Sequence, residues 1–376
     1  MRFTIITFGC QMNVHDSDWL ARALTARGWE AADESEADVH ILNTCSVREK
    51  PEQKVYSELG RLAAANPGAF AAVGGCVAQQ LGEAFFRRFP SVRLVFGADG
   101  VAAAPDALER LMDEPGARLT LTDFLAAYPE RDTAVVEAPQ QVPPGQAYVN
   151  IMQGCDNFCA YCIVPYVRGR QKSRHPDAVV EECRRLVQEG GARELTLLGQ
   201  NVNSYGQDAG GAGVDFTQLL HSVAGIEGLE RLRFTTSHPK DIAAGVVRAF
   251  GELEVLCPQL HLPLQSGSDA VLARMGRKYD RGRYLGIVEA LRAARPDMAL
   301  TTDLIVGFPG EGGDDFEQTL EVMERVRYQS SFSFKYNDRP GVAAVRMRPK
   351  VEPETAAARL TRLQDLQNAH TRESLK

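Results

Sequence analysis

Short apolar segments alternate with helical patterns along the first part of this 376-residue chain, and that alternation restricts the fold to α/β architectures with parallel strands. Connections between such strands are right-handed, so the strands all end at the same edge of the sheet. We therefore predict an N-terminal parallel sheet with one shared carboxyl edge. The expected strands are residues 3–8, 39–42 and 70–73, and the expected helices are about 16–27, 49–64, 79–88 and 103–112.

The alternation resumes further along and predicts a second domain. Six strand candidates follow at the spacing of βα units, which indicates a partial (β/α)6 barrel of the TIM type, with its chemistry at the carboxyl ends of the strands. Polar residues at those ends are Gln200, Ser237 and Gln265, and Asp303 is an acid within an apolar strand that needs a partner or a role. The six expected strands are residues 147–152, 194–198, 232–236, 259–264, 300–306 and 331–336.

A stretch rich in proline and glycine separates the two series of strands. Pro139, Pro143, Pro144 and Gly145 lie where the helical and strand patterns weaken, which is typical of a linker. The sequence therefore predicts three parts, which are an N-terminal α/β domain (1–125), a linker (126–146) and a barrel domain that ends in a helix (147–376).

Three cysteines within eight residues form the most specific motif of the chain. Cys155, Cys159 and Cys162, here called the barrel set, have the spacing C-x3-C-x2-C, which gathers soft thiolate ligands in one loop. A structural zinc site needs a fourth ligand, and the nearest candidate, His175, has no second partner at finger spacing. Three thiolates on a four-iron cluster leave one iron open for a small molecule. The pattern favours such a cluster over the alternatives, a zinc site or unliganded buried thiols.

A second set of three cysteines follows from the predicted sheet. Cys10, Cys45 and Cys76, here called the sheet set, each come just after a predicted strand, at the edge where open α/β sheets bind ligands. A single buried cysteine is more often a small hydrophobic residue than a ligand, but three at equivalent positions favour a shared site. We therefore predict a second cluster there. Cys183 and Cys257 are expected to be structural.

Composition limits the setting and the partners. The chain has no run of eighteen apolar residues and no signal-peptide pattern, so we expect a cytoplasmic protein that does not bind membranes. In a reducing compartment its eight cysteines are not expected to form disulfides. The net charge of -7 argues against nucleic-acid binding by the whole surface. An RNA site must therefore be a local basic patch.

Two alternating basic stretches are the candidates for that patch. Arg168, Arg170, Lys172 and Arg174 follow directly after the barrel set. Charge runs are usually solvated faces, but in an acidic chain these cations are the best placed to contact RNA phosphates. A second stretch near the C-terminus contains Arg346, Arg348 and Lys350.

Both cysteine sets and the residues around them resemble the radical S-adenosylmethionine methylthiotransferase family over nearly the whole chain. The detail fits the branch of tRNA-2-methylthio-N6-dimethylallyladenosine synthases. Members of this family continue into a small RNA-binding β-barrel called TRAM, and the resemblance implies that this sequence, which ends at Lys376 in a helical stretch, lacks it. The matching motifs are FGCQMN at 8–13, NTCSVREK at 43–50, GCVAQQ at 75–80, TLLGQNVNSYG at 196–206, and SFKY at 333–336 followed by RPG at 339–341.

The resemblance implies a reaction and its cofactors. Two [4Fe-4S] clusters are expected, with S-adenosylmethionine bound at the cluster of the barrel set and cleaved there to a 5'-deoxyadenosyl radical. That radical would break the C2–H bond of N6-isopentenyladenosine 37 in tRNA, the cluster of the sheet set would supply sulfur, and a second S-adenosylmethionine would methylate it. Tyr161 is expected against the adenine of the cofactor, with Gln200, Ser237, Gln265 and Asp303 in the same pocket.

The resemblance also implies partners. These are the anticodon stem-loop of tRNA with its N6-isopentenyladenosine, an electron donor of flavodoxin or ferredoxin type and a sulfur donor. The protein itself is expected to be a monomer. Two alternatives within the family are threonylcarbamoyl-adenosine in tRNA and a ribosomal protein as substrates, and the sequence QMN after Cys10 argues against both. An alternative of another class is an iron-sulfur carrier or electron-transfer protein, which would not cleave S-adenosylmethionine.

Overall fold

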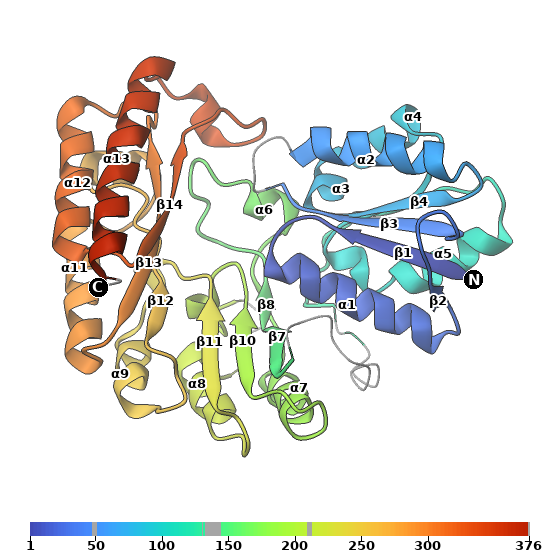
Figure 1. Ribbon diagram of the computed structural model, residues 1–376, viewed down its shortest axis with the longest axis horizontal. Coiled ribbons are helices and arrows are strands. Elements are labelled where there is room, and N and C mark those ends of the chain that lie inside the picture. Colours follow the sequence, from blue (N-terminus) through green and yellow to red (C-terminus); the bar gives the residue numbers. More distant parts are fainter. Residues whose placement is uncertain (47–50, 130, 132–143, 209–212, 375–376) are drawn as a thin grey trace.

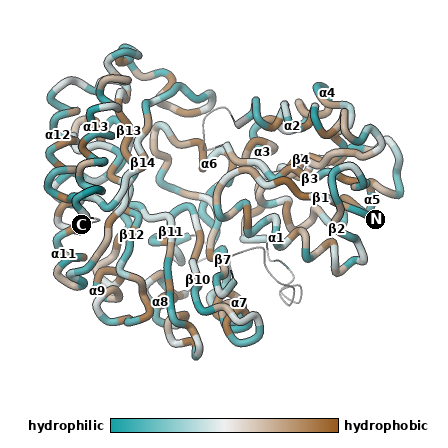
Figure 2. The backbone as a smooth tube through the Cα atoms, in the orientation of Figure 1, coloured by the Kyte–Doolittle hydropathy of each residue, from teal (hydrophilic) through white to brown (hydrophobic). Residues whose placement is uncertain are grey.

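The computed structural model describes residues 1–46, 51–129, 131, 144–208 and 213–374, which form two domains side by side (Figure 1). The N-terminal domain is built on a parallel sheet with the strand order β2-β1-β3-β4-β5-β6. Figure 2 shows hydrophobic residues along β1 and β3, as expected for a parallel sheet covered on both faces. The strands are β1 (Arg2–Thr7), β2 (Glu30–Ala31), β3 (Val39–Thr44), β4 (Phe70–Gly75), β5 (Val92–Phe96) and β6 (Leu119–Leu121).

Helices cover both faces of this sheet because successive strand residues point to opposite sides. Ile41 packs in one hydrophobic cluster with Trp19, whereas the next residue, Leu42, packs in another with Leu59. The first cluster lies under α1 and α5, and the second under α2, α3 and α4 (Figure 1). The helices are α1 (Gln11–Ala26), α2 (Pro51–Ala65), α3 (Cys76–Leu81), α4 (Ala84–Arg88) and α5 (Ala104–Asp113).

The three strands predicted for this domain are confirmed, and β1, β3 and β4 are neighbours in the sheet. Strands β2, β5 and β6 lie outside the prediction. The helix expected from about 16 begins earlier, at Gln11. The helix expected at about 79–88 is instead divided into α3 and α4, because the chain turns at Gly82, whose φ of 49° is left-handed.

The second domain is the predicted partial barrel of six parallel strands. Its two ladders, β7-β10-β11 and β12-β13-β14, adjoin where Leu232 bridges to Leu256, just before β12. All pairings within the ladders are parallel. The strands are β7 (Gln146–Asn150), β10 (Glu194–Leu198), β11 (Arg231–Thr235), β12 (Gln259–His261), β13 (Ala299–Val306) and β14 (Ser330–Lys335).

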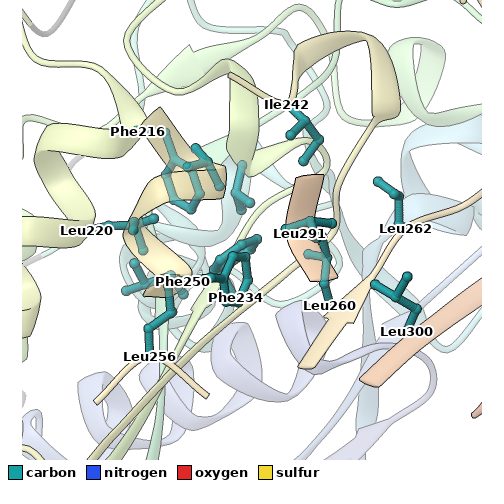
Figure 3. Close-up of a cluster of buried hydrophobic side chains, with 14 of the residues drawn as sticks. Phe216, Leu220, Phe234, Ile242, Phe250, Leu256, Leu260, Leu262, Leu291 and Leu300 are labelled. Atoms are coloured by element: carbon teal, nitrogen blue, oxygen red, sulfur yellow. The ribbon is translucent and has the colours of Figure 1, made fainter. Parts of the chain in front are cut away.

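Helices pack on the outside of the barrel and enclose its core. Figure 3 shows Phe234 of β11 beside Phe216 and Phe250, with ring centres 5.0 Å and 5.8 Å away. Cys183 lies in this core and Cys257 is buried, as their expected structural role requires. None of the helices that the structure describes has the length and apolar character to cross a membrane. The helices are α7 (Pro176–Gln188), α8 (Phe216–Ala224), α9 (Ala244–Glu252), α10 (Asp269–Arg274), α11 (Arg281–Ala294), α12 (Gly313–Val326) and α13 (Pro353–Ser374).

The two domains meet through a polar, buried interface. Helix α1 packs beside β7, and α3 packs beside a short helix of the barrel domain, α6 (Val164–Val167) (Figure 1). The carboxyl edge of the N-terminal sheet therefore faces the loops of the barrel. Among the described residues, two ion pairs cross the interface with both partners buried, namely Asp16 with Arg168 and Asp99 with Lys172, and the buried His15 Nε2 lies 3.7 Å from the carboxylate of Glu182.

Candidate active site

The sheet set comes together at the carboxyl edge of the N-terminal sheet, as predicted. Cys10 lies between β1 and α1, Cys45 follows β3, and Cys76 is the first residue of α3. The thiol of Cys45 lies within hydrogen-bonding reach of the sulfur atoms of both Cys10 and Cys76. Three neighbouring parallel strands thus bring residues that are distant in sequence into contact.

The three thiols of the sheet set differ in acidity. The hydrogen bond from Cys45, helped by the charge of Arg168, lowers the pKa of Cys10 to about 6 and that of Cys76 to about 5, although burial opposes both shifts. Hydrogen bonding with its two cysteine neighbours, together with burial, raises the pKa of Cys45 itself. Because the thiolate is the form that binds metal, the sheet set suits a soft metal centre.

Two glycines allow the strand ends of the sheet set to approach closely. Gly9 has a φ of 130°, and a Cβ there would lie 2.3 Å from the Cβ of Cys45. Gly75 has a φ of 87°, and a Cβ there would lie 2.2 Å from the carbonyl oxygen of Thr44. A larger residue at either position would push the cysteines apart.

Two buried asparagines fix the backbone beside the sheet set. Asn13 Nδ2 donates to Asn43 Oδ1 at 2.8 Å, and Asn43 Nδ2 donates to the carbonyl oxygen of Asn13 at 2.9 Å. Asn13 Oδ1 also accepts from the thiol of Cys10 at 3.3 Å and from Arg168 at 3.2 Å. Sequence reasoning missed these roles, although both asparagines lie within the motifs that surround the cysteines.

The barrel set lies in the loop after β8 (Met152–Gln153). Cys159 is buried, while Cys155 and Cys162 are half-buried. Burial raises the pKa of Cys155 to about 11 and that of Cys162 to about 12. The backbone N–H of Cys155 donates to the carbonyl oxygen of Gly169 at 3.2 Å, which ties the loop to the segment after α6.

Arg277 is a buried cation beside the barrel set that sequence reasoning missed. Its Nη1 lies 3.5 Å from the sulfur of Cys159 and 3.4 Å from the hydroxyl of Tyr161, and its Nη2 donates to the carbonyl oxygen of Pro263 at 2.9 Å. His238 Nε2 lies 3.8 Å from the same sulfur, and burial lowers the pKa of His238 to about 2, so this imidazole is neutral. An arginine in a loop after a short helix carries no sequence signal of such a role.

Two of the predicted pocket residues lie where a polar cofactor can be held. Gln200 Oε1 accepts from the backbone N–H of Gly154 at 2.5 Å, and its side-chain nitrogen reaches the sulfur of Met12 in the other domain. The buried hydroxyl of Ser237 and the Oδ1 atom of Asn201 have no hydrogen-bond partner in the part of the chain that the structure describes. Buried polar atoms without partners fit a ligand rich in polar groups, such as S-adenosylmethionine.

The other two predicted pocket residues have structural partners. The carboxylate of Asp303 lies 3.4 Å from His261 Nε2, and His261 Nδ1 lies 2.9 Å from the hydroxyl of Thr301. Gln265 is buried with a φ of 70°, and its backbone N–H donates to the carbonyl oxygen of Asp303 at 2.8 Å. Contact of Asp303 and Gln265 with the cofactor stays a prediction.

The structure corrects the prediction of an exposed basic stripe after the barrel set. Arg168, Lys172 and Arg174 are only 3%, 4% and 5% exposed. They are buried because each points into the interior toward an acidic side chain, respectively Asp16, Asp99 and Glu182. The prediction is therefore wrong for these three residues, which do not meet RNA phosphates in this structure.

The remaining predicted cations have other surroundings. Arg170 keeps its side chain 72% exposed while pairing with Asp156 at 2.8 Å. Near the C-terminus Arg346 and Arg348 are exposed, and Lys350 pairs with Asp338 at 2.5 Å. Arg170, Arg346 and Arg348 thus stay available to a partner.

The donor chemistry of both sets fits iron-sulfur clusters. No group of three or more His, Cys, Asp or Glu side chains among the described residues is arranged around one metal ion. Each set instead offers three sulfur donors, with Arg168 beside Cys76 in one and Arg277 beside Cys159 in the other. Three cysteine sulfur ligands with a buried cation next to them suit a [4Fe-4S] cluster that keeps one iron open.

Family comparisons divide the chain in the same way as the structure. Residues 2–97 match the family described as uncharacterized protein family UPF0004, and residues 149–323 match the radical SAM superfamily. The first match contains the whole sheet set, and the second contains the whole barrel set.

Curated relatives resemble the chain over its full length. A tRNA-2-methylthio-N(6)-dimethylallyladenosine synthase from Nitratidesulfovibrio vulgaris is 61% identical over 377 residues, which cover 100% of this chain and 83% of that protein. A protein of the same name from Lawsonia intracellularis is 53% identical, and the match covers 100% of this chain and 84% of that protein. Another from Geobacter sulfurreducens is 49% identical, and the match covers 98% of this chain and 82% of that protein.

Solved structures share the fold at low sequence identity. The radical S-adenosylmethionine methyltransferase TsrM from Kitasatospora setae, with cobalamin and a [4Fe-4S] cluster bound, has a TM-score of 0.68 at 12% identity, over 92% of this chain and 74% of its own. The cobalamin-dependent S-adenosylmethionine radical enzyme OxsB has a TM-score of 0.59 at 12% identity, over 98% of this chain and 56% of its own. Both similarities concern the fold alone.

Proposed function

The chain belongs to the family of tRNA-2-methylthio-N(6)-dimethylallyladenosine synthases, and from this premise we propose that it converts N6-isopentenyladenosine at position 37 of tRNA to its 2-methylthio derivative. The observation that carries the proposal is the placement of two sets of three cysteines on the two sides of one domain interface, with Arg168 of the barrel domain in contact with Cys76 of the sheet set. The enzyme is a radical S-adenosylmethionine methylthiotransferase that uses two [4Fe-4S] clusters.

The barrel set would hold one cluster and the sheet set the other. When bound, these clusters and S-adenosylmethionine supply the radical chemistry that breaks an unactivated C–H bond, together with the sulfur and the methyl group. Tyr161, Gln200 and Ser237 would orient S-adenosylmethionine, with Gln265 and Asp303 as further residues of the same pocket. Arg277 would hold Cys159 and Tyr161 in place through its hydrogen bonds.

The protein side chains supply position and exclude water. Gln200 reaches Gly154 in the loop of the barrel set and Met12 beside the sheet set, so one side chain spans both halves of the site. Asn13 and Arg168 hold the sheet set against the barrel. A closed junction of this kind keeps water away from reactive species formed between the domains.

The partners follow from the same proposal. The substrate would be the anticodon stem-loop of a tRNA that carries N6-isopentenyladenosine. An electron donor of flavodoxin or ferredoxin type and a sulfur donor would serve the two clusters, and the protein would act as a monomer in the cytoplasm.

The test is anaerobic reconstitution followed by incubation with isopentenylated tRNA, S-adenosylmethionine and a reductant. Mass spectrometry of the digested nucleosides should find 2-methylthio-N6-isopentenyladenosine. Activity only on tRNA with threonylcarbamoyl-adenosine, or only on a ribosomal protein, would move the protein to another branch of the family. A protein that binds iron but does not cleave S-adenosylmethionine would be a carrier or an electron-transfer protein, contrary to the proposal.

A further inference from the structure

Three exposed aromatic side chains form one surface beside the barrel set. Phe124, Phe158 and Tyr166 are 48%, 42% and 49% exposed, which is unusual for large rings in a folded chain. Together with the exposed Arg170 they are here called the aromatic patch. Exposed apolar surface of this kind marks interaction sites.

Three members of the aromatic patch, Phe158, Tyr166 and Arg170, contact one another. The ring of Phe158 meets that of Tyr166 edge to face at a centre distance of 6.2 Å, and the guanidinium of Arg170 lies 5.1 Å from the centre of the Phe158 ring. Phe124 arrives from the segment after β6 and lies on Gly169, where an added Cβ would come within 2.9 Å of its ring. Phe124 thus lies against the backbone next to Arg170, so both domains contribute to this surface.

Polar anchors hold this surface in place. The backbone N–H of Leu125 donates to Asp99 at 2.8 Å, and Lys172 donates to the carbonyl oxygen of Leu125 at 3.3 Å. These contacts fix the backbone next to Phe124. Arg170 is held over Phe158 by its ion pair with Asp156. The rings are thus exposed on an anchored backbone.

The aromatic patch is continuous with the active site. Phe158 lies between Cys155 and Cys159 in the sequence of the barrel set. Gly169, under the ring of Phe124, accepts the hydrogen bond from the backbone of Cys155, and a Cβ on Gly154 would come within 2.0 Å of the carbonyl oxygen of Arg170. A ligand on the patch would therefore lie against the loop that carries the barrel set.

We propose that the aromatic patch binds unpaired bases of an RNA loop by stacking, and so holds the nucleotides next to the adenosine that enters the active site. The inference rests on the proposed function, which requires an RNA base at the adjoining site. Aromatic rings and arginine planes are the groups on which splayed bases stack. The chain has a net charge of -7, and three of the four predicted cations after the barrel set are buried, so stacking would supply binding that these three cations do not.

The test measures binding of a fluorescent anticodon stem-loop RNA, with N6-isopentenyladenosine at position 37, by anisotropy. The double variant Phe124→Ala/Tyr166→Ala should bind it about 10-fold or more weakly. The slope of log affinity against log salt should not change, because no phosphate contact is lost. Tyr166→Phe, which keeps the ring, should bind like the wild type. Affinity for a fully paired duplex of the same strand should be unaffected, because its bases are not free to stack.

Phe86→Ala is the matched control. Phe86 also lies against an arginine, Arg118 at 5.5 Å, but it belongs to α4, away from the carboxyl edge of the sheet (Figure 1). Iron content and circular dichroism check that each variant folds.

Wild-type affinity of the double variant for the stem-loop would overturn the inference. So would a wild-type dimer that the double variant dissociates, since the patch would then bind a second copy. Nucleoside analysis of the wild type tests the proposed function separately. If the wild type makes the 2-methylthio product and the variants bind RNA normally, the proposed function is supported but the aromatic patch does not bind the RNA.

Discussion

Arg168 Nε, from the barrel domain, lies 3.3 Å from the sulfur of Cys76 in the N-terminal domain, with both side chains buried. The relationship is repeated at the other set, where Arg277 lies 3.5 Å from Cys159. Both arginines come from the barrel domain, so the barrel supplies a cation to each set. Hydrogen bonds and charges next to a metal centre change its affinity and its reduction potential.

Replacing Arg168 should therefore affect one cluster and spare the other. Arg168→Ala should weaken retention of iron by the sheet set about 10-fold and lower the reduction potential of that cluster, since a nearby cation stabilises the more negative reduced state. A redox titration followed by electron paramagnetic resonance measures the potential, and competition with a chelator measures the retention. Arg168→Lys should restore the potential in part. Arg277→Ala is the matched control and should shift the other cluster, and equal shifts of both clusters would contradict the assignment.

The two cysteine sets should separate by function. Alanine at all three positions of the sheet set should lower iron from about eight to about four per chain, keep cleavage of S-adenosylmethionine and abolish methylthiolation. Alanine throughout the barrel set should abolish both reactions. Deoxyadenosine and the 2-methylthio nucleoside are measured in parallel, with Cys257→Ala as a cysteine control outside both sets. If the folded sheet-set variant still methylthiolates tRNA, those cysteines do not supply the sulfur.

Gly75→Ala should damage the sheet set through crowding rather than backbone strain alone. A Cβ at Gly75 would come within 2.2 Å of the carbonyl oxygen of Thr44, whereas Gly28, with a similar φ of 80°, has nothing within 4 Å of its added Cβ. Gly28→Ala should therefore cost only the left-handed penalty, about 1–2 kcal/mol, and keep all its iron. Gly75→Ala should cost more and lose iron from the sheet set. Denaturant unfolding and iron analysis measure both, and equal behaviour of the two variants would exclude the crowding argument.

Glu182 should make stability sensitive to acid. Burial alone would raise its pKa, but Arg174 and His15 together lower it to about 2 from the usual 4.5. A depressed pKa contributes stability that is present above about pH 4.5 and is lost as the pH falls toward 2, and the shift corresponds to about 3 kcal/mol. Glu182→Gln should therefore flatten that part of the profile of unfolding free energy against pH. A variant with the wild-type slope between pH 4.5 and 2 would show that other groups cause the acid sensitivity.

The sequence predicts parallel strands in the N-terminal domain. Because parallel strands end at the same edge of a sheet, it also predicts that the cysteines of the sheet set lie close together. Strand β5 was harder to detect, since Val92–Phe96 is a short apolar run that periodicity does not distinguish from a buried helical turn. Strand β6 has three half-buried residues and, among the strands that the structure describes, pairs with β5 alone, so it depends on a neighbour that the prediction lacks.

The burial of Arg168, Lys172 and Arg174 could not be predicted from the local sequence pattern. The alternation from Arg168 to Arg174 indicates an extended segment with charges on one side, and such a side usually faces water. Three of its four cations face Asp16, Asp99 and Glu182 instead, and the first two of these acids belong to the other domain. A charged side chain can be buried when it has an ion-pair partner, and here the partners are distant in sequence. The local sequence pattern does not identify them.

The contacts between charged side chains across the interface also fix the position of the sheet set relative to the barrel set. Asp16, Asp99 and His15 of the N-terminal domain contact three different residues of the barrel domain. These are Arg168, Lys172 and Glu182, respectively. Turning or sliding one domain against the other would leave at least one buried charge without its counterpart, which typically costs several kcal/mol. The separation between the sheet set and the barrel set is therefore fixed by matched charges across the interface. It does not depend on the length of chain that joins the domains.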